Sequence, residues 1–227
     1  MMHNLSIRLK TIASLVPYGA RVCDIGTDHG HLAIHLKSQE IANSVIAADI
    51  NQKPLENAKR NIEKSGVGDI ELRLCDGLES ISKGEVDTVI IAGMGSEVIS
   101  GILERGYKIT EDKNITLILQ PTTSPELLRK FLCSKGYEII KEIPVFENNK
   151  LYSVMLISFS GQSKEYDELF YYIGKVPKDN LYGIKYIKKQ QKRFSDCAKQ
   201  LENVSYKAEE FKYYKNLLDK ISDYLGE

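Results

Sequence analysis

The stretch VCDIGTDHGHL, from Val22 to Leu32, joins a β-rich run to an amphipathic run through a turn with two glycines and two aspartates. Residues 21–25 predict a β-strand, and residues from about 29 to 37 predict a helix. In an open parallel sheet, ligands bind beyond the carboxyl ends of the strands, and the first strand-to-helix turn is the usual contact. The stretch therefore predicts both the start of such a sheet and one wall of its ligand site.

The same alternation continues along the chain. Further strands are predicted at residues 44–49, 70–74, 86–92 and 115–119, with helices at 53–65, 97–104 and 125–135. Residues 137–145 and 151–159 are extended runs joined by a turn at 147–150, which predicts a hairpin. We therefore expect an α/β fold, Rossmann-like, in which helices cover a seven-stranded and mostly parallel sheet.

The two ends of the chain predict helices instead. An amphipathic helix is expected over residues 4–16, and residues 181–225 predict two helical arms. The apolar stripes of these arms contain Ile184, Ile187, Gln191 and Phe194 in the first, and Phe211, Tyr214, Leu217, Leu218 and Ile221 in the second. We expect a ligand-binding domain in residues 1–160 and a helical hairpin domain in residues 161–227.

The composition excludes several classes of protein. Lys plus Arg equals Asp plus Glu at 31 each, so any contact with nucleic acid needs a local cluster of cations. The four cysteines form no CxxC pair and no secretory leader is present, which predicts a cytoplasmic protein with reduced thiols. No apolar run approaches the roughly 20 residues of a membrane span. We expect no membrane contact, and a monomer is favoured although the sequence does not report it.

The chemistry of the first turn indicates its ligand. The turn from Asp24 to Gly30 has the spacing D-x-G-x-G-x-G with Asp28 in place of the middle glycine. A dinucleotide site favours G-x-G-x-x-G, because the pyrophosphate approaches the start of the helix. Two carboxylates repel a pyrophosphate but favour a ligand that carries an ammonium and a sulfonium. The turn therefore predicts S-adenosylmethionine rather than NAD.

Later strand ends agree with this ligand. Asp49 can accept hydrogen bonds from both ribose hydroxyls of an adenosine, and Asp76 can accept one from the adenine amino group. Gly77 leaves room for the backbone to approach the ring. The predicted cofactor-binding residues are Asp24, Gly26, Thr27, Asp28, Gly30, Asp49, Ile50, Asp76, Gly77, Gly93 and Met94. The histidines His29, His31 and His35 lack HExxH or a carboxylate at ligand spacing, so no metal is expected.

These motifs resemble one family, the bacterial tRNA (adenine-22) N1-methyltransferases. The matching segments are LSIRLKTIASLVP, DIGTDHGHL, VIAADI, CDGLESI, IIAGMGSEVI and LILQP, followed by the helical tail. The resemblance spans nearly the whole chain. It implies a Rossmann-like class I methyltransferase domain, a coiled-coil-like C-terminal domain, and methylation of N1 of an adenine in the D-loop region of tRNA. The chain departs from the family pattern at His31, where an aromatic residue is frequent, and at Ser96, where a glycine is.

The residues themselves agree with this chemistry. Enzymes that methylate adenine on N6 usually carry a D/N-P-P-Y/F segment after the fourth strand, and Ala92-Gly93-Met94-Gly95 lacks it. Adenine N1 owns a lone pair, so alignment with the methyl donor can supply most of the acceleration. Because the product ring is cationic, Asp28 is the predicted catalytic residue that stabilises the charge. The alternative, that Asp28 caps the following helix, is equally open.

The N1 atom lies on the Watson–Crick edge, so the target must be unpaired or extruded before reaction. The predicted substrate contacts are Arg8, Lys10, His29, His31, Gly95, Gln120, Pro121, Lys188, Lys189, Lys192 and Arg193. Solvated helix faces are the alternative for these cations. A strand-ending turn is the alternative at 120–121. For the whole protein, the alternatives are a methyltransferase for another RNA base or a small molecule, and a non-catalytic RNA-binding protein.

Overall fold

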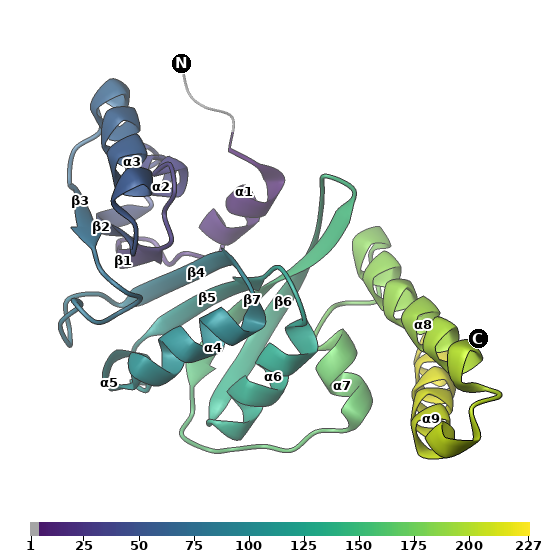
Figure 1. The fold of residues 1–227 in the computed structure, drawn as a ribbon. Helices are drawn as coiled ribbons and strands as arrows, with labels where there is room; N and C mark the ends of the chain where they lie inside the picture. The colour runs from purple at the N-terminus through teal and green to yellow at the C-terminus, as the bar shows by residue number, and fades with distance from the viewer. Residues whose placement is uncertain (1–4) are drawn as a thin grey trace.

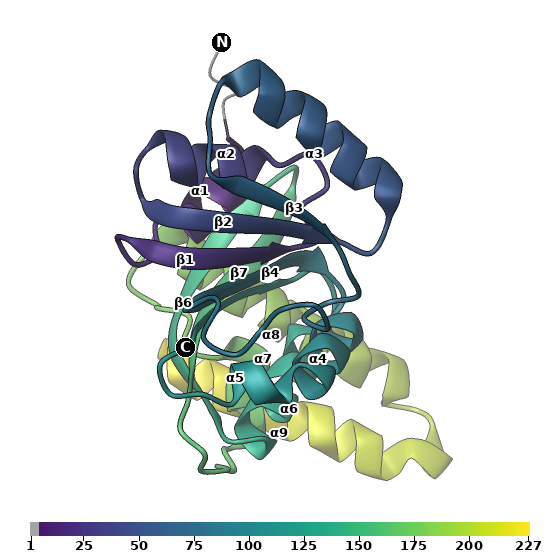
Figure 2. The same ribbon diagram turned by 90° about the vertical axis from the view of Figure 1, so that its left-hand side faces the viewer.

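The computed structural model describes residues 5–227 and is built on a seven-stranded sheet in the order β3-β2-β1-β4-β5-β7-β6 (Figures 1 and 2). The strands are β1 (Ala20–Ile25), β2 (Ala42–Asp49), β3 (Ile70–Leu74), β4 (Thr88–Met94), β5 (Thr116–Pro121), β6 (Tyr137–Glu147) and β7 (Lys150–Phe159). The first five run parallel, and β7 lies antiparallel between β5 and β6. The predicted fold class, including the terminal hairpin, is confirmed.

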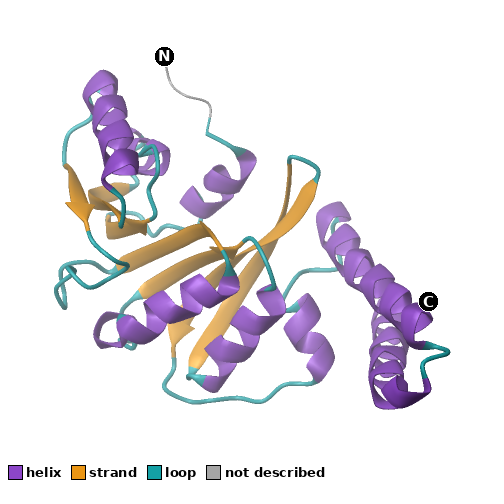
Figure 3. Cartoon of the chain, in the orientation of Figure 1, coloured by secondary structure: helices purple, strands orange, loops and turns teal. Residues whose placement is uncertain are grey.

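Helices cover both faces of the sheet (Figure 3). They are α1 (Ile7–Ala13), α2 (His31–Ser38), α3 (Gln52–Ser65), α4 (Ser96–Arg105), α5 (Tyr107–Thr110), α6 (Pro125–Ser134), α7 (Glu168–Ile173), α8 (Leu181–Leu201) and α9 (Ala208–Leu225), with a 3-10 turn at Ser205–Lys207. The predicted N-terminal helix is shorter than expected, and residue 4 lies outside the described chain. The short helices α5 and α7 escaped prediction because neither is long enough to show a helical period. No helix among residues 5–227 has the length and apolar character needed to cross a membrane.

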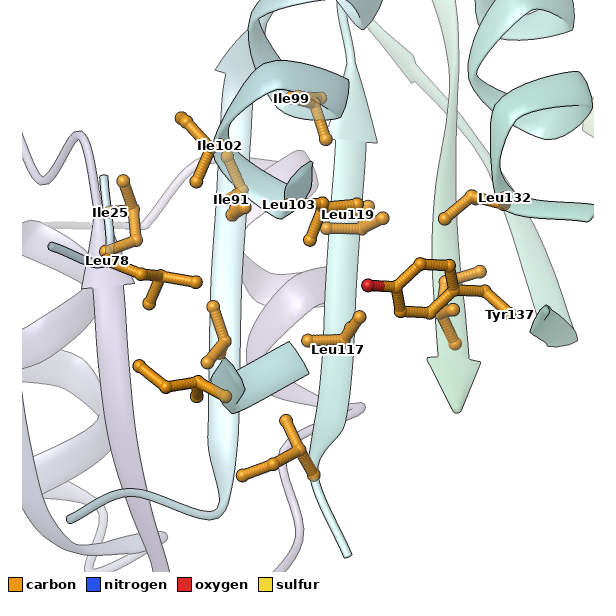
Figure 4. Close-up of a cluster of buried hydrophobic side chains, with 14 of the residues drawn as sticks. Ile25, Leu78, Ile91, Ile99, Ile102, Leu103, Leu117, Leu119, Leu132 and Tyr137 are labelled. Atoms are coloured by element: carbon orange, nitrogen blue, oxygen red, sulfur yellow. The ribbon is translucent and has the colours of Figure 1, made fainter. Parts of the chain in front are cut away.

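Strand periodicity explains the two layers. Val22 packs against α1 and α2, whereas its neighbour Cys23 faces the layer that contains α4 and α6. The same alternation holds in β4, where Ile90 and Ile91 point to opposite faces. Figure 4 shows the second layer, where aliphatic side chains of β4, β5 and α4 meet next to the ring of Tyr137. Burial of the central strands on both faces holds their ends in fixed positions.

The C-terminal helices form the expected hairpin, with a different apolar face on α8. Ile187 and Phe194 are buried against Leu217 and Ile221 of α9, as predicted. Ile184 is 36% exposed, so its place in the buried stripe was wrong. Two unpredicted residues, Tyr186 and Gln190, are buried instead, because α8 also packs on β6 and β7. The helix therefore has two buried faces, one toward α9 and one toward the sheet.

A buried ion pair joins the hairpin to the sheet. Arg129 of α6 and Glu142 of β6 are fully buried, and Arg129 Nη2 lies 2.8 Å from Glu142 Oε2. Arg129 Nη1 donates to the carbonyl oxygens of Tyr171 and Tyr172 at the end of α7, at 2.7 and 3.0 Å. Its Nη2 also donates to the hydroxyl of Tyr186 in α8 at 3.0 Å. One guanidinium thus holds α6, β6, α7 and α8 together.

Removing the charge of Glu142 should unfold this junction. Glu142→Gln leaves the Arg129 guanidinium buried without a counter-charge, so the free energy of unfolding should fall by about 3–5 kcal/mol in urea titrations. The matched control is Asp196→Asn, which breaks the exposed Lys192–Asp196 pair and should cost about 1 kcal/mol or less. Equal losses in the two variants would contradict the importance of the buried pair.

Candidate functional site

A cavity of about 260 Å³ opens at the carboxyl ends of β1 and β4, where the strand order reverses. The predicted site residues that line it are Arg8, Asp24, Gly26, Thr27, Asp28, His29, His31 and Gly93. The cavity thus brings the first turn together with the N-terminal helix and the end of the fourth strand. The sequence predicted that the first turn and the end of the fourth strand would share one site. Asp49 and Asp76, at the two other strand ends that it assigned to the cofactor, do not line this cavity.

The turn after β1 is held close to both neighbouring strands. The backbone N–H groups of Gly26 and Thr27 donate to the carbonyl of Ala48 in β2, at 2.8 and 3.1 Å. Gly26 has φ +78°, and a Cβ at this position would overlap Cε of Met94. A side chain is therefore excluded by both the backbone conformation and the space. This glycine lets the turn lie directly on the end of β4.

Asp28 occupies the position at which the motif has its middle glycine, and it keeps the glycine-like conformation. Its φ is +45°, which a residue with a side chain rarely adopts. The side chain is 69% exposed, and its Oδ2 lies 3.4 Å from Nε2 of His29. The helix α2 begins after Gly30, and no side chain caps it. The capping alternative for Asp28 is therefore wrong, because the residue lies too early in the turn.

Asp24 is a buried carboxylic acid on the wall of the cavity. It is the last residue but one of β1, and it is only 5% exposed. Burial raises the pKa of Asp24 from 3.8 to about 6; the Thr27 hydroxyl lowers it, and the negative charge of Asp49 raises it. A buried carboxylate of this kind favours a cationic ligand, because the ligand supplies the counter-charge that the protein does not.

The ends of β2 and β3 lie beside this cavity in the sheet. Asp49 Oδ1 accepts a hydrogen bond from the backbone of Asn51 at 2.8 Å, which fixes its carboxylate, and the following Ile50 is 60% exposed. Asp76 Oδ1 accepts one from Arg105 of α4 at 2.9 Å. Gly77 packs on α4, where an added Cβ would lie 3.0 Å from Ile102. The absence of a side chain at Gly77 thus serves helix packing, a reason that the sequence did not show.

Arg8 reaches into the cavity from α1. Its backbone N–H donates to Glu147 Oε1 at 3.1 Å, and its Nε lies 3.4 Å from Glu147 Oε2. Its Nη1 donates to Gln120 Oε1 at 2.6 Å, and the N–H of Gly93 donates to the same oxygen at 3.1 Å. Gln120 Nε2 in turn donates to the carbonyl of Pro121 at 2.7 Å. The solvated alternative for Arg8 is therefore wrong. At 120–121 the strand does end at Pro121, as the alternative had it, and the buried Gln120 does not line the cavity but fixes Arg8.

Glu147 holds Arg8 at the cavity, and the sequence did not identify it. It is the last residue of β6, next to the turn before β7, where an acidic residue is ordinary. Only the fold places it against Arg8, which is 139 positions away. No spacing rule could have found this pair. The hairpin turn therefore positions the cation of the site.

Two predicted substrate residues lie at the margin of the cavity. Lys10 is an exposed residue of α1. Burial of His35 lowers the pKa of that histidine, and the positive charge of Lys10 lowers it further. Gly95 precedes α4, and a Cβ there would lie 3.2 Å from Oγ1 of Thr123. Neither residue lines the 260 Å³ cavity. Within residues 5–227, no group of three or more His, Cys, Asp and Glu is arranged to hold a metal ion.

The cation cluster of α8 divides between two helix faces. Lys189 and Arg193 line a second cavity of about 360 Å³, which also includes Pro121. Lys188 and Lys192 instead form ion pairs with Glu227 and Asp196, at 2.8 and 2.7 Å. No acid lies among the clustered cations, but Asp196 follows one turn later in α8 and Glu227 comes from the end of the chain. Arg193 also has an acidic partner, since its Nη1 lies 2.9 Å from Oε1 of Glu126.

The comparisons with known proteins agree on one class. A family model described as a methyltransferase domain matches residues 5–155. The tRNA (adenine(22)-N(1))-methyltransferase of Bacillus subtilis (strain 168) is 40% identical over 165 residues, which are 72% of this chain and 68% of that protein. The structure of M. capricolum TrmK with S-adenosyl-homocysteine is 31% identical, has a TM-score of 0.81 and aligns over 99% of each chain. A Streptococcus pneumoniae protein solved with S-adenosyl-L-methionine is 28% identical, with a TM-score of 0.79 over 95% of this chain and 100% of that one.

Asp24 should make the protein less stable as the pH rises. Its folded-state pKa of about 6 lies above the ordinary 3.8, so the folded chain binds the extra proton between these values. Stability is therefore lost as the pH rises from about 4 through 6. The variant Asp24→Asn lacks this titration and should exceed the wild type in free energy of unfolding by on the order of 2–3 kcal/mol at pH 8. The two should converge near pH 4 in urea titrations, and a difference independent of pH would contradict the assignment.

Proposed function

The chain belongs to the tRNA (adenine(22)-N(1))-methyltransferase family, and on this basis we propose that it methylates N1 of adenine 22 in the D-loop region of tRNA. The observation that carries the proposal is Asp28. It is an exposed carboxylate in a strained backbone conformation, at the edge of a cavity whose wall contains the buried Asp24. Strain of this kind at a ligand-binding turn is typical of residues selected for function.

The residues of the site fit S-adenosylmethionine as the methyl donor. The buried carboxylate of Asp24 would bind the ammonium of the amino-acid portion, where it removes the cost of burying an isolated charge. The carboxylate of Asp49, fixed by the backbone of Asn51, would bind the ribose hydroxyls, and Asp76 would accept from the adenine. The bound cofactor supplies an electrophilic methyl group. The remaining predicted contacts are Gly26, Thr27, Gly30, Ile50, Gly77, Gly93 and Met94.

The acceptor side needs alignment and charge stabilisation. The lone pair of adenine N1 attacks without a prior proton transfer, so the protein mainly orients the base. As the bond forms, positive charge spreads over the ring and the carboxylate of Asp28 stabilises it. His29 and His31 line the same cavity and would contact the base. Gln120 acts indirectly, since its oxygen already accepts from Arg8 and Gly93.

The path of the RNA is proposed from the placement of the cations. Arg8 holds its guanidinium at the cavity, and Lys189 and Arg193 face the adjacent cavity on α8. Lys189 would contact a phosphate directly. Arg8 and Arg193, which have acidic partners, would be outer contacts together with Lys10, Lys188 and Lys192. We further propose a catalytic domain in residues 1–160, a tRNA-binding domain in residues 161–227, and action as a monomer in the cytoplasm, where tRNA is available.

The activity is tested with unmodified tRNA transcripts and S-adenosylmethionine. Digestion and mass spectrometry should detect 1-methyladenosine, mapped to position 22. The variant Asp28→Asn should lower kcat on the order of 100-fold with little change in cofactor affinity, because it removes the charge that stabilises the cationic ring.

The matched control is Asp69→Asn. Asp69 is also an exposed aspartate with positive φ, at +56°, and it lies at the start of β3, away from the cavity. Its exchange should leave turnover unchanged. Full turnover by a folded Asp28→Asn protein would refute the catalytic role, and a different methylated nucleoside would refute the target.

The two faces of α8 should differ in their effect on tRNA binding. Lys185 lies one turn before Lys189 on α8, with its Nζ 5.9 Å from the ring centroids of Phe146 and Tyr182. The double variant Lys185→Ala/Lys189→Ala should weaken tRNA binding and lower the salt slope by roughly 0.7–0.9 for each phosphate that the protein no longer neutralises. The paired face is the control: in Lys188→Ala/Lys192→Ala, both lysines already have acidic partners, so the effect should be smaller. Fluorescence anisotropy at several salt concentrations measures both. The reverse order of effects would place the RNA on the other face.

A further inference from the structure

The second cavity is lined by residues that include Pro121, Lys189 and Arg193, and it shares no lining residue with the first. The loop between β5 and α6 forms one of its walls. The N–H of Thr122 donates to the carbonyl of Met94 at 2.8 Å. The hydroxyl of Ser96 donates to the carbonyls of Thr123 and Ser124, at 2.7 and 2.9 Å. The wall is therefore fixed to the end of β4, which also borders the first cavity.

Two consecutive residues of β5 connect the cavities. Gln120 accepts hydrogen bonds from Arg8 and Gly93, both of which line the first cavity. The next residue, Pro121, lines the second. Because consecutive residues of a strand point to opposite faces, the two cavities flank the carboxyl end of β5. A strand of RNA that crosses this end would meet both of them.

The chemistry of the second cavity fits a nucleotide. Tyr152 of β7 lines it and is partly exposed, so an aromatic face is available for stacking. Arg193 is already neutralised by Glu126, whereas Lys189 has no ion-pair partner within residues 5–227. The cavity thus offers one unpaired positive charge, which matches one phosphodiester.

Gln190 gives a second indication of a polar ligand. The residue lines the cavity and is 6% exposed, and its Oε1 has no hydrogen-bond partner in the described part of the chain. A buried acceptor without a donor costs free energy, so a ligand whose N–H group reaches Oε1 would stabilise this wall of the cavity. The exocyclic amino groups of nucleobases are such donors.

We propose that this cavity binds the nucleotide next to the target adenine, with its base on Tyr152 and its phosphate at Lys189. This inference rests on the proposed function for the identity of the target. It adds a specificity site for RNA sequence and shape, separate from the cavity where the methyl group is transferred. The target adenine is thereby positioned by contacts to the neighbouring nucleotide as well as by contacts to its own base.

The test couples a protein variant to a change in the RNA. Transcripts carry an abasic nucleotide on the 5′ or the 3′ side of the target, and their Kd is measured by anisotropy without cofactor. With the wild type, one of these positions should weaken binding about 5- to 150-fold, the range for loss of one stacked base. Tyr152→Ala should weaken binding of the intact transcript by a similar factor and show no further loss on the abasic transcript.

Two controls separate stacking from folding. Tyr152→Phe keeps the ring and should bind like the wild type, and Tyr206→Ala removes a tyrosine that is 85% exposed in the turn between α8 and α9. If Tyr152→Ala and the abasic position each weaken binding and their factors multiply when combined, the ring and the base act independently and the proposal is overturned. It is also overturned if neither change weakens binding. The test measures binding and not methylation. If Tyr152→Ala and the abasic position share one loss of affinity but the protein methylates no tRNA, only the proposed function is refuted.

Discussion

The fully buried ion pair between Arg129 and Glu142 is the interaction on which the arrangement of this molecule depends. It lies where the last strands of the sheet meet the C-terminal helices, and it satisfies carbonyl groups at the end of α7. Gly174 follows α7 with φ +60°, and a side chain there would overlap the Glu142 carboxylate. The backbone turn at Gly174 and the position of the Glu142 carboxylate therefore depend on each other.

The C-terminal helical hairpin is consequently fixed against β6 and β7 of the sheet. Helix α8 meets β6 and β7 through Tyr186 and Gln190, and it meets α9 through its other face. Because Tyr186 contacts Arg129, the orientation of α8 is linked to the position of α6 and of the loop before it. The second cavity exists only where these elements come together. A hairpin on a free linker would not form it.

The sequence predicted the strand ends and therefore the position of the site. Asp24, Gly26 and Gly93 were assigned to one cavity from their order at successive strand ends, and the fold brings them together. Such prediction works because parallel strands place their carboxyl ends along one edge. It failed for interactions between distant segments. The acids that pair with Lys188 and Arg193, at positions 227 and 126, carry no local signal.

Local rules also misled where a functional turn departs from them. Aspartate is a common helix cap, yet α2 starts three residues after Asp28, and this aspartate adopts the conformation of the glycine it replaces. Likewise, Ile184 fits an apolar stripe, but the sheet contact turns α8 so that this residue faces outward. In both cases tertiary constraints outweigh the periodicity that the sequence displays.

The contact between Arg8 and Glu147 has a consequence for how the molecule is made. A ribosome releases Arg8 early, and its partner follows only after 138 intervening residues have been synthesised. The strands that hold Asp24, Asp49 and Met94 precede the hairpin in the chain and can pair before it emerges. Non-local contacts of this length form late in folding. We therefore expect the strand ends with Asp24 and Asp49 to be in place first, and the contact that holds Arg8 at the cavity to form only when the β6–β7 hairpin reaches the N-terminal helix.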